Sequence, residues 1–304
     1  MVMVQSVLET FKQATTELAL CEMAVRGLKT LTGYDRVMAY CFGKDGHGEV
    51  IAESLEAGLQ PYLGLRYPAS DVPSQARRQY LLQRVGAVAD SNYQPVPMLV
   101  HATAHDVAPL DMTHCSLRSI SPSHYEYMRN MGTAASMTIA LTSHRQLWGM
   151  LVCHHVTPRI AGSELRAAAD MVGQIVSLLL TSLGETALYS ERLDRSHTLR
   201  ALIDALAAPV PLQDAFVAAE TELLKLVEAD GALVRIAGTD LRLGRVPPPG
   251  AAQSALLTLH ALAAGKPLAV DDLALRHPDL DDCTAAGSGA LLLPLSEAGD
   301  DAIL

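Results

Sequence analysis

The stretch SMTIALTSHRQLWGMLVCHH, residues 136–155, decides the fold class of the first half of this sequence. Met137, Ile139 and Leu141 alternate with small or polar residues, which is the period of a strand that is buried on one face. A polar turn follows, and the apolar run after it has the character of a second strand. The stretch therefore predicts a β-hairpin.

A second hairpin is predicted upstream, where RVMAYCF (36–42) and EVIAE (49–53) flank the turn sequence KDGHG. Residues from about 5 to 31 have apolar side chains at helical spacing, and Gly33 follows where a C-cap is common. We expect both hairpins to share one antiparallel sheet. Helices on the faces of that sheet would complete an α+β domain over residues 1–162.

Residues 163–208 continue a helical pattern in which Gly173 and Gly184 are the only early breaks. The pattern predicts a long connecting helix, although two ordinary helices broken near Gly184 fit the periodicity equally well. A second, partial domain of the same kind is expected over residues 209–304, beginning with a helix at 215–227. The last residues resemble the start of a strand whose partner would lie outside the sequence, which suggests a fragment.

Composition narrows the possible functions. A chain of 304 residues that is 49% hydrophobic is long enough for two buried cores. The net charge of -10, with 23 scattered Lys and Arg residues, argues against an extended nucleic-acid surface. The most apolar stretch, 171–183, is too short and too often interrupted for a membrane span. Without a signal-peptide pattern or paired cysteines, the sequence favours the cytoplasm.

The segment between the hairpins contains an unusual loop. In GLRYPASDVPSQARRQY (64–80), Pro68 and Pro73 bracket Asp71, and a residue before proline is pushed toward extended backbone. The pattern predicts a stiff loop followed by a short helix with Ser74 as its N-cap. If the segment stood alone, Asp71 would be expected to make only local turn hydrogen bonds.

Two further segments bring compatible chemistry. CSLRSISPSHYEYMRNMG (115–132) contains His124 and Tyr127, and the strand QLWGMLVCHH ends in His154 and His155. A lone strand histidine is usually a satisfied core residue. If these segments close one pocket, however, it offers guanidinium groups and hydroxyls for carboxylates, an acceptor for ring N–H groups, and apolar walls. Such a pocket suits a large, flat, partly anionic ligand.

Three motifs together resemble a known family. RYPASDVPSQARRQY, LRSISPSHYEYMRNMG and QLWGMLVCHH occur in the order found in the chromophore-binding GAF domain of phytochromes, most closely bacteriophytochromes, and the resemblance covers residues 10–180. The second half resembles the start of the PHY domain, a second GAF-like fold. The resemblance implies a red/far-red photoreceptor that binds a linear tetrapyrrole, biliverdin IXα or a similar bilin. It further implies a homodimer through the long helix. The resemblance also implies signalling to a C-terminal output module such as a histidine kinase, or to a response regulator. It implies that this sensory region is not itself an enzyme.

The resemblance also implies roles for particular residues. Asp71 would accept hydrogen bonds from pyrrole N–H groups through its backbone carbonyl, His124 would lie beside the inner pyrroles, and His154 would bond the D-ring carbonyl. The other implied contacts are with the D ring (Tyr40, Tyr67 and Tyr127) and the two propionates (Tyr80, Arg118, Ser136 and Thr138), with Val72, Pro73 and Ser121 beside them.

Three departures from the family affect attachment and charge. Where plant and cyanobacterial phytochromes have the attachment cysteine, this sequence has Ser123, and a hydroxyl is a far poorer nucleophile than a thiolate. Bacteriophytochromes use a cysteine ahead of an N-terminal PAS domain, and this sequence begins at the first GAF helix, so we expect non-covalent binding. An arginine for one propionate is replaced by Gly86. Arg84 lies two residues earlier, faces the same side of an extended segment, and is expected to substitute.

Other functions are weaker candidates. A GAF module without a chromophore, which dimerises or binds another small ligand, is the main alternative. A Cys-His hydrolase would use Cys153 or Cys115, but neither lies in a nucleophile signature. His101 and His105 have the spacing of helical metal ligands, yet nearby prolines and the missing third ligand argue against a metal site.

Overall fold

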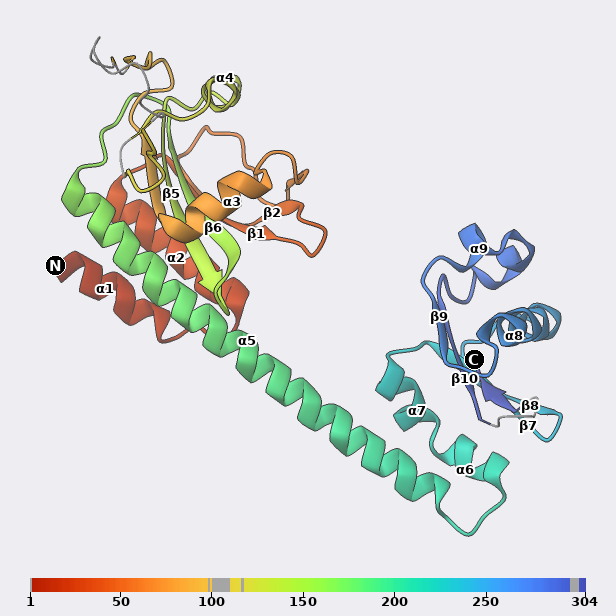
Figure 1. The fold of residues 1–304 in the computed structure, drawn as a ribbon. Coiled ribbons are helices and arrows are strands. Elements are labelled where there is room, and N and C mark those ends of the chain that lie inside the picture. The colour runs from red at the N-terminus through yellow and green to blue at the C-terminus, as the bar shows by residue number, and fades with distance from the viewer. Residues whose placement is uncertain (1, 98, 100–109, 116–117, 296–300) are drawn as a thin grey trace. The chain divides into compact units, whose positions relative to one another are not determined.

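Figure 1 shows the fold of the chain as a computed structural model. The chain divides into two compact units, Met1–Ala187 and Leu188–Leu304. Each unit contains one antiparallel sheet with helices packed on it, which confirms the predicted α+β class. The structure describes residues 2–97, 99, 110–115, 118–295 and 301–304.

The sheet of the first unit has six strands in the order β3-β2-β1-β6-β5-β4. Both predicted hairpins are present, since β1 pairs with β2 and β5 pairs with β6, all antiparallel. The hairpins join through β1 and β6, where Arg36 lies opposite His154. The strands span Arg36–Phe42 (β1), Gly48–Leu55 (β2), Arg66–Tyr67 (β3), Val85–Val88 (β4), Ala135–Ser143 (β5) and Gln146–His155 (β6).

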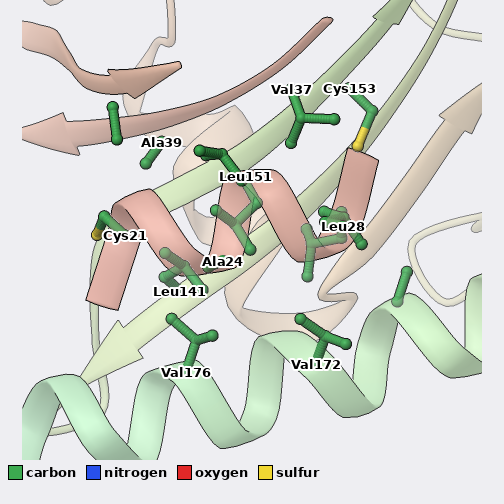
Figure 2. Packing of buried hydrophobic residues seen from close by; sticks show 14 of the residues in the cluster. Cys21, Ala24, Leu28, Val37, Ala39, Leu141, Leu151, Cys153, Val172 and Val176 are labelled. Carbon is green, nitrogen blue, oxygen red and sulfur yellow. The ribbon is translucent and has the colours of Figure 1, made fainter. Parts of the chain in front are cut away.

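One face of this sheet is covered by α2 and the first half of α5, and α1 packs against α2. Figure 2 shows the core between α2, α5 and the strands. Leu28, Leu151 and Val176 are buried members of that cluster. Because side chains alternate along a strand, Val37 of β1 joins this core while Tyr40 faces the opposite side. The helices of this unit span Val2–Phe11 (α1), Glu17–Thr32 (α2), Ser74–Leu82 (α3), Pro122–Asn130 (α4) and the start of Ser163–Leu206 (α5).

The expected single helix over residues 5–31 is wrong, because α1 ends at Phe11 and α2 begins at Glu17. Thr16 has extended backbone, and its hydroxyl accepts the N–H of Ala19 at 3.1 Å. A threonine side chain that satisfies a free helical N–H favours a new helix start over a continuous helix. Gly33 closes α2 in the left-handed conformation at φ 63°, as the sequence predicts.

The long helix α5 runs without a break from Ser163 to Leu206, so the alternative of two helices broken near Gly184 is wrong. Gly173 lets the helix approach the sheet closely, since a Cβ there would lie 2.4 Å from Cγ2 of Ile139. By length and composition alone, α5 is apolar enough to cross a membrane. However, Val172, Val176 and Leu180 of the same helix are buried in the core of the first unit, which identifies this part as a core helix.

The second unit has a five-stranded antiparallel sheet in the order β8-β7-β11-β10-β9. The helix expected over 215–227 is two helices, and Phe216 and Leu223 on either side of the break both reach the same apolar cluster. The elements are Leu212–Ala218 (α6), Glu220–Val227 (α7), Gly231–Ile236 (β7), Thr239–Gly244 (β8), Pro249–Ala263 (α8), Leu268–Val270 (β9), Leu273–Arg276 (α9), Pro278–Cys283 (η1, a 3-10 helix), Ala290–Pro294 (β10) and Ala302–Ile303 (β11).

The last strand, β11, contradicts the expectation of a strand without its partner. Ala302 pairs with Arg235 of β7 on one side and with Pro294 of β10 on the other. Ala302 is fully buried, and both residues of β11 therefore lie inside the sheet rather than at an unpaired edge.

Candidate functional site

The sheet face opposite the first core carries a cavity of about 550 Å³. This volume lies within the range of roughly 300–1,000 Å³ that is typical of small-molecule sites. The walls come from the loop before α3, from α3, β4 and α4, and from the segment leading into α4. The residues predicted for the site that line it are Asp71, Val72, Pro73, Tyr80, Arg118, Ser121, His124 and Tyr127, and Ser123 lines it as well.

The loop that carries Asp71 is a turn held between two prolines. The N–H of Asp71 donates to the carbonyl of Pro68 at 3.0 Å. Pro73 then takes the N-cap position of α3 with extended backbone and no side-chain cap, so the prediction that Ser74 is the N-cap is wrong. Ser74 is instead the first helical residue. The fixed φ of proline, here -64°, already suits the approach to a helix.

Asp71 lies beside three tyrosines. The hydroxyl of Tyr127 donates to Oδ2 of Asp71 at 3.4 Å. Burial, followed by the charge of Asp71, raises the pKa of Tyr127. Tyr40 and Tyr67 lie behind the loop, with ring centroids 5.9 Å apart, in a small apolar cluster that includes Val72. Tyr40 and Tyr67 therefore support the cavity rather than line it.

The two predicted histidines lie at different depths, one on the cavity wall and one behind it. His124 lies on the first turn of α4, where the hydroxyl of Ser121 accepts its N–H at 3.3 Å, and its ring stacks on Tyr127. Burial lowers the pKa of His124. His154 lies deeper, on β6, with Nδ1 at 3.3 Å from the hydroxyl of Thr133, and does not line the cavity. Burial, followed by the charge of Arg36, lowers the pKa of His154 to about 3.

Arg36 belongs to a buried ion pair beneath this region. Its Nε lies 3.4 Å from Oε1 of Glu53, and both side chains are almost fully buried. Oε2 of Glu53 accepts the backbone N–H groups of Tyr62 at 2.9 Å and Leu63 at 3.1 Å. The guanidinium of Arg36 covers the ring of Tyr62 at 3.6 Å. The pair thus fixes the loop after β2 against the sheet beside His154.

The residues predicted for carboxylate binding are only partly gathered on the cavity. Tyr80 lines the cavity. Burial raises the pKa of Tyr80, and a hydrogen bond with Thr138 of β5 partly opposes this rise. Nη1 of Arg118 donates to the carbonyl of Thr113 at 3.0 Å, while its side chain remains part of the wall. Ser136 is buried opposite His154 in the sheet and does not line the cavity.

The prediction that Arg84 faces the cavity beside Gly86 is wrong. Nε and Nη2 of Arg84 donate to the two carboxylate oxygens of Asp170 on α5, at 2.9 and 3.2 Å. Gln174 donates to the same carboxylate at 2.8 Å. Gly86 does line the cavity, and a Cβ there would meet only Tyr80, at 4.0 Å.

Three glutamines on α3 and at its C-cap were not predicted for the site. Gln75, Gln79 and Gln83 all line the cavity, and Gln79 also donates to the carbonyl of Thr113 at 2.6 Å. Their four-residue spacing, which places them on one side of a helix, was the available signal. Cys115 lines the cavity too, although the sequence pointed to it only as a weak candidate for a hydrolase nucleophile.

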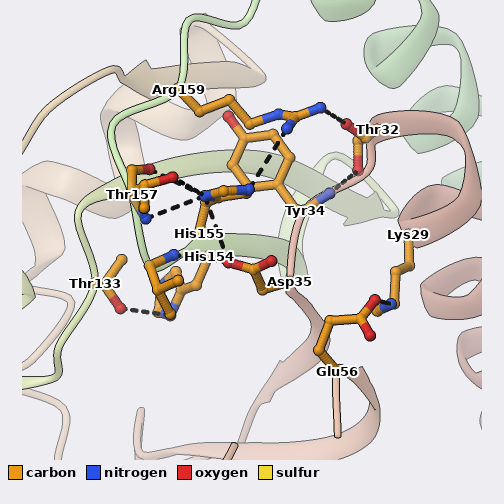
Figure 3. A network of polar contacts seen from close by, with 11 residues as sticks. Lys29, Thr32, Tyr34, Asp35, Glu56, Thr133, His154, His155, Thr157 and Arg159 are labelled. Atoms are coloured by element: carbon orange, nitrogen blue, oxygen red, sulfur yellow. Dashed lines mark hydrogen bonds and ion pairs between the residues drawn. The ribbon is translucent and has the colours of Figure 1, made fainter.

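The end of β6 carries a separate polar network, drawn in Figure 3. Nδ1 of His155 lies 3.4 Å from Oδ2 of Asp35 and accepts the N–H of Thr157 at 3.1 Å. Arg159 ties this network to α2 by donating to the carbonyl of Thr32 at 2.8 Å. These contacts fix the chain where it leaves the sheet.

The hydrolase and metal alternatives find no support in the described part of the chain. Cys153 is buried in the first core, on the face of β6 opposite His154, and burial raises the pKa of its thiol. Among the described residues, no three His, Cys, Asp or Glu side chains gather to hold a metal ion. His101 and His105 lie outside the described residues.

Comparisons with known proteins match family models to both units of the chain. A GAF domain family model matches residues 17–180, and a phytochrome region model matches residues 195–304. The chain is 33% identical to cyanobacterial phytochrome B of Nostoc sp. over 95% of this chain and 38% of that protein. It is 34% identical to a bacteriophytochrome of Xanthomonas campestris over 94% of this chain and 47% of the relative. The chain therefore spans less than half the length of these relatives.

Solved structures give the same result. A bacteriophytochrome of the photosynthetic bacterium R. palustris matches with a TM-score of 0.76 and 29% identity, over 99% of this chain and 62% of that one. The phytochrome photosensory core module of Stigmatella aurantiaca matches with a TM-score of 0.74 and 33% identity, over 99% of this chain and 60% of that one.

Proposed function

Because the chain belongs to the GAF domain family and is a bacteriophytochrome-like photosensory module, we propose that it binds a linear tetrapyrrole such as biliverdin in the cavity beside Asp71. The observation that carries this proposal is the convergence of three separate sequence segments on one cavity. Asp71, Gly86 and His124 come from different segments and line the same space of about 550 Å³. The donors, acceptors and apolar walls there fit a long, flat molecule with carboxylates.

The residues of the cavity suit a positively charged chromophore. When bound, a bilin supplies absorption of red light and the isomerisation of its D ring. Burial lowers the pKa of His124 on the cavity wall and of His154 behind it, which favours neutral imidazoles that add hydrogen bonds without a repelling charge. Asp71 is the acidic residue among the described lining residues, and it places a negative charge at the same cavity. Arg118 and Tyr80 offer donors to carboxylates.

We further propose that this chain holds the bilin without a covalent bond. Ser123 occupies the first turn of α4 on the cavity wall, where a hydroxyl replaces the reactive thiol. Cys115 is the cysteine among the described lining residues, and it is therefore the first candidate if a bond does form.

The test is assembly with biliverdin. We expect the purified chain mixed with biliverdin to develop a red-shifted absorption band that changes reversibly under red light. After acid denaturation and zinc staining, the protein band is expected to show no fluorescence. A fluorescent band that disappears in a Cys115→Ser variant would contradict non-covalent binding. No spectral change at all would contradict bilin binding and favour a GAF module without a chromophore.

A second prediction concerns the charge of the cavity. Arg118 is the only Lys or Arg among the described lining residues, whereas Gly86 on β4 has open space beside it. We expect Gly86→Arg to add a partner for a bilin carboxylate. One net charge-assisted hydrogen bond would tighten biliverdin binding by about tenfold.

Titration of biliverdin, followed by absorbance, measures this effect. The matched control is Gly162→Arg, which adds the same charge at an open, exposed position. Biliverdin dimethyl ester should show no gain with Gly86→Arg, because it lacks the carboxylates. An equal gain with the ester, or none with biliverdin, would refute the prediction.

We also propose that the module works in the cytoplasm as a homodimer through α5, signalling to an output module such as a histidine kinase. Relatives longer than this chain support an output region. Large apolar side chains are exposed along α5 at spacings near multiples of 3.5 residues, which is typical of a helix that pairs with another helix. Sedimentation equilibrium measures the dimer, and a monomer at high concentration would contradict it. The exposed apolar side chains of α5 include Met171, Leu178, Tyr189 and Ile203.

A further inference from the structure

One side chain, Arg77, holds the loop on both sides of Asp71. Arg77 lies on the first turn of α3 and is half-buried. Its Nε donates to the carbonyl of Val72 at 2.7 Å, and its Nη2 donates to the carbonyl of Ala69 at 3.3 Å. The backbone before Asp71 and the backbone after it are therefore bonded to the same rigid group.

The same guanidinium also reaches the β1–β2 hairpin. Nη2 of Arg77 donates to the carbonyl of Gly46 in the hairpin turn, and the guanidinium carbon lies 4.3 Å from the centre of the Phe42 ring. Gly46 has a φ of 87°, and a Cβ there would lie 3.1 Å from Nη1 of Arg77. The turn thus has a glycine where both its backbone conformation and the close approach of Arg77 favour one.

We propose that Arg77 is a positioning residue, which fixes the backbone of Asp71 at the cavity and thereby sets the spectrum and photochemistry of the bound bilin. This inference rests on the proposed function. Asp71 itself is exposed, and its side chain has only the long hydrogen bond from Tyr127 among its described side-chain contacts. The direction of its carbonyl therefore depends on the loop, and the loop depends on Arg77.

The contacts that Arg77 makes require an arginine side chain. A guanidinium presents donors in a fixed planar fork and can stack on an aromatic ring, whereas a lysine ammonium is a compact point charge on a flexible stem. Only the fork can bond three carbonyls from two loops and cover the ring of Phe42 at the same time. Lysine at this position should preserve the charge but not the geometry.

Arg77 is also connected to the tyrosines behind the loop. The ring of Phe42 contacts Tyr40 edge-on with centroids 5.3 Å apart, and Tyr40 in turn lies 5.9 Å from Tyr67. The positive charge of Arg77 acts against the burial that raises the pKa of Tyr40. A change at Arg77 is thus expected to reach the cavity from two sides, through Asp71 and through Tyr40.

The first experiment needs no bilin. Hydrogen exchange of the amides of residues 69–72 is compared in the parent chain, Arg77→Met and Arg78→Met. Arg78 is the matched control, because it is the adjacent arginine on the same helix and is exposed. Loss of the net stabilisation from one hydrogen bond should speed exchange about tenfold in Arg77→Met. Equal exchange rates in all three chains would show that Arg77 does not hold the loop of residues 69–72.

The second experiment uses the chains assembled with biliverdin. We expect Arg77→Met to shift the red absorption band and to change the rate of dark reversion by about threefold, which corresponds to a change in the activation barrier smaller than that for a tenfold rate change. Arg77→Lys should restore only part of both properties, and Arg78→Met should match the parent. A purely structural role would lower the unfolding midpoint of Arg77→Met but leave the spectrum and kinetics of the assembled protein unchanged, and that result would overturn the proposal.

Two safeguards keep the outcomes distinct. If Arg77→Met does not fold, Phe42→Leu removes the ring under the guanidinium while keeping its donors, and should give a smaller change in the same direction. Parental spectra in both Phe42→Leu and Arg77→Lys would then overturn the proposal. If the parent chain binds no biliverdin, the proposed function fails, while the exchange experiment still decides whether Arg77 holds the loop.

Discussion

Replacing Glu53 by alanine is expected to lower the free energy of unfolding of the first unit by about 3–5 kcal/mol, the usual cost of breaking a buried ion pair. The variant leaves Arg36 charged and buried, with Nε no longer facing a carboxylate at 3.4 Å. It also removes the acceptor for the N–H groups of Tyr62 and Leu63. The desolvated charge accounts for most of the expected loss.

Urea unfolding followed by the fluorescence of Trp148 measures this loss. Trp148 is the single tryptophan of the chain and packs against the core of the first unit, so the signal reports that unit. Glu9→Ala is the control, because it breaks an exposed ion pair with Lys12 and should cost at most about 0.5 kcal/mol. A loss below about 1 kcal/mol in Glu53→Ala would show that the pair is not effectively buried.

The second large effect is expected in acid and depends on His154. Its pKa is lowered from 6.5 to about 3, so the folded state holds it neutral while the unfolded chain takes up a proton below pH 6.5. Stability is therefore fully present above pH 6.5 and is lost as the pH falls toward 3. The slope is about 1.4 kcal/mol per pH unit for one proton, which gives a total on the order of 5 kcal/mol.

Comparison with His154→Gln isolates this contribution from that of the acidic residues. As the pH is lowered from 7 to 4, the stability advantage of the parent over His154→Gln should shrink steadily in the same Trp148 assay. His144→Gln, at an exposed position in the β5–β6 turn, controls for the loss of a histidine as such. A difference between parent and His154→Gln that does not change with pH would refute the prediction.

The sequence was a good guide to the fold wherever one face of an element is buried. RVMAYCF coincides with β1, and Met137, Ile139 and Leu141 of β5 are all fully buried, because alternation reflects burial directly. The break before α2 was missed, since Thr16 acts through one side-chain cap that periodicity does not register. The short strand β4 was missed as well, because four residues carry too little pattern and its pairing with β5 is set by the tertiary fold.

The site was predictable where residue type is tied to chemistry. Asp71, His124 and Tyr127 stand in distinctive motifs, and the structure brings them to one cavity. The position of Arg84 was predicted wrongly. Alternation in an extended segment indicates which side of the segment a residue faces, but not which residue it contacts. The contact of Arg84 is with Asp170, which lies far away in the sequence. Arg77 lay inside a quoted motif, yet its bonding partners are backbone carbonyls, which leave no trace in residue type.

The central position of β11 imposes an order on how the second unit can form. Among the described residues, strands β7 and β10 do not pair directly and are joined through Ala302 and Ile303, so the sheet stays in two halves until those residues are available. Closing it requires a long-range contact, and such contacts form late because their loop-closure entropy must be overcome first. During synthesis on the ribosome, the first unit can therefore complete its core while the second unit still lacks β11.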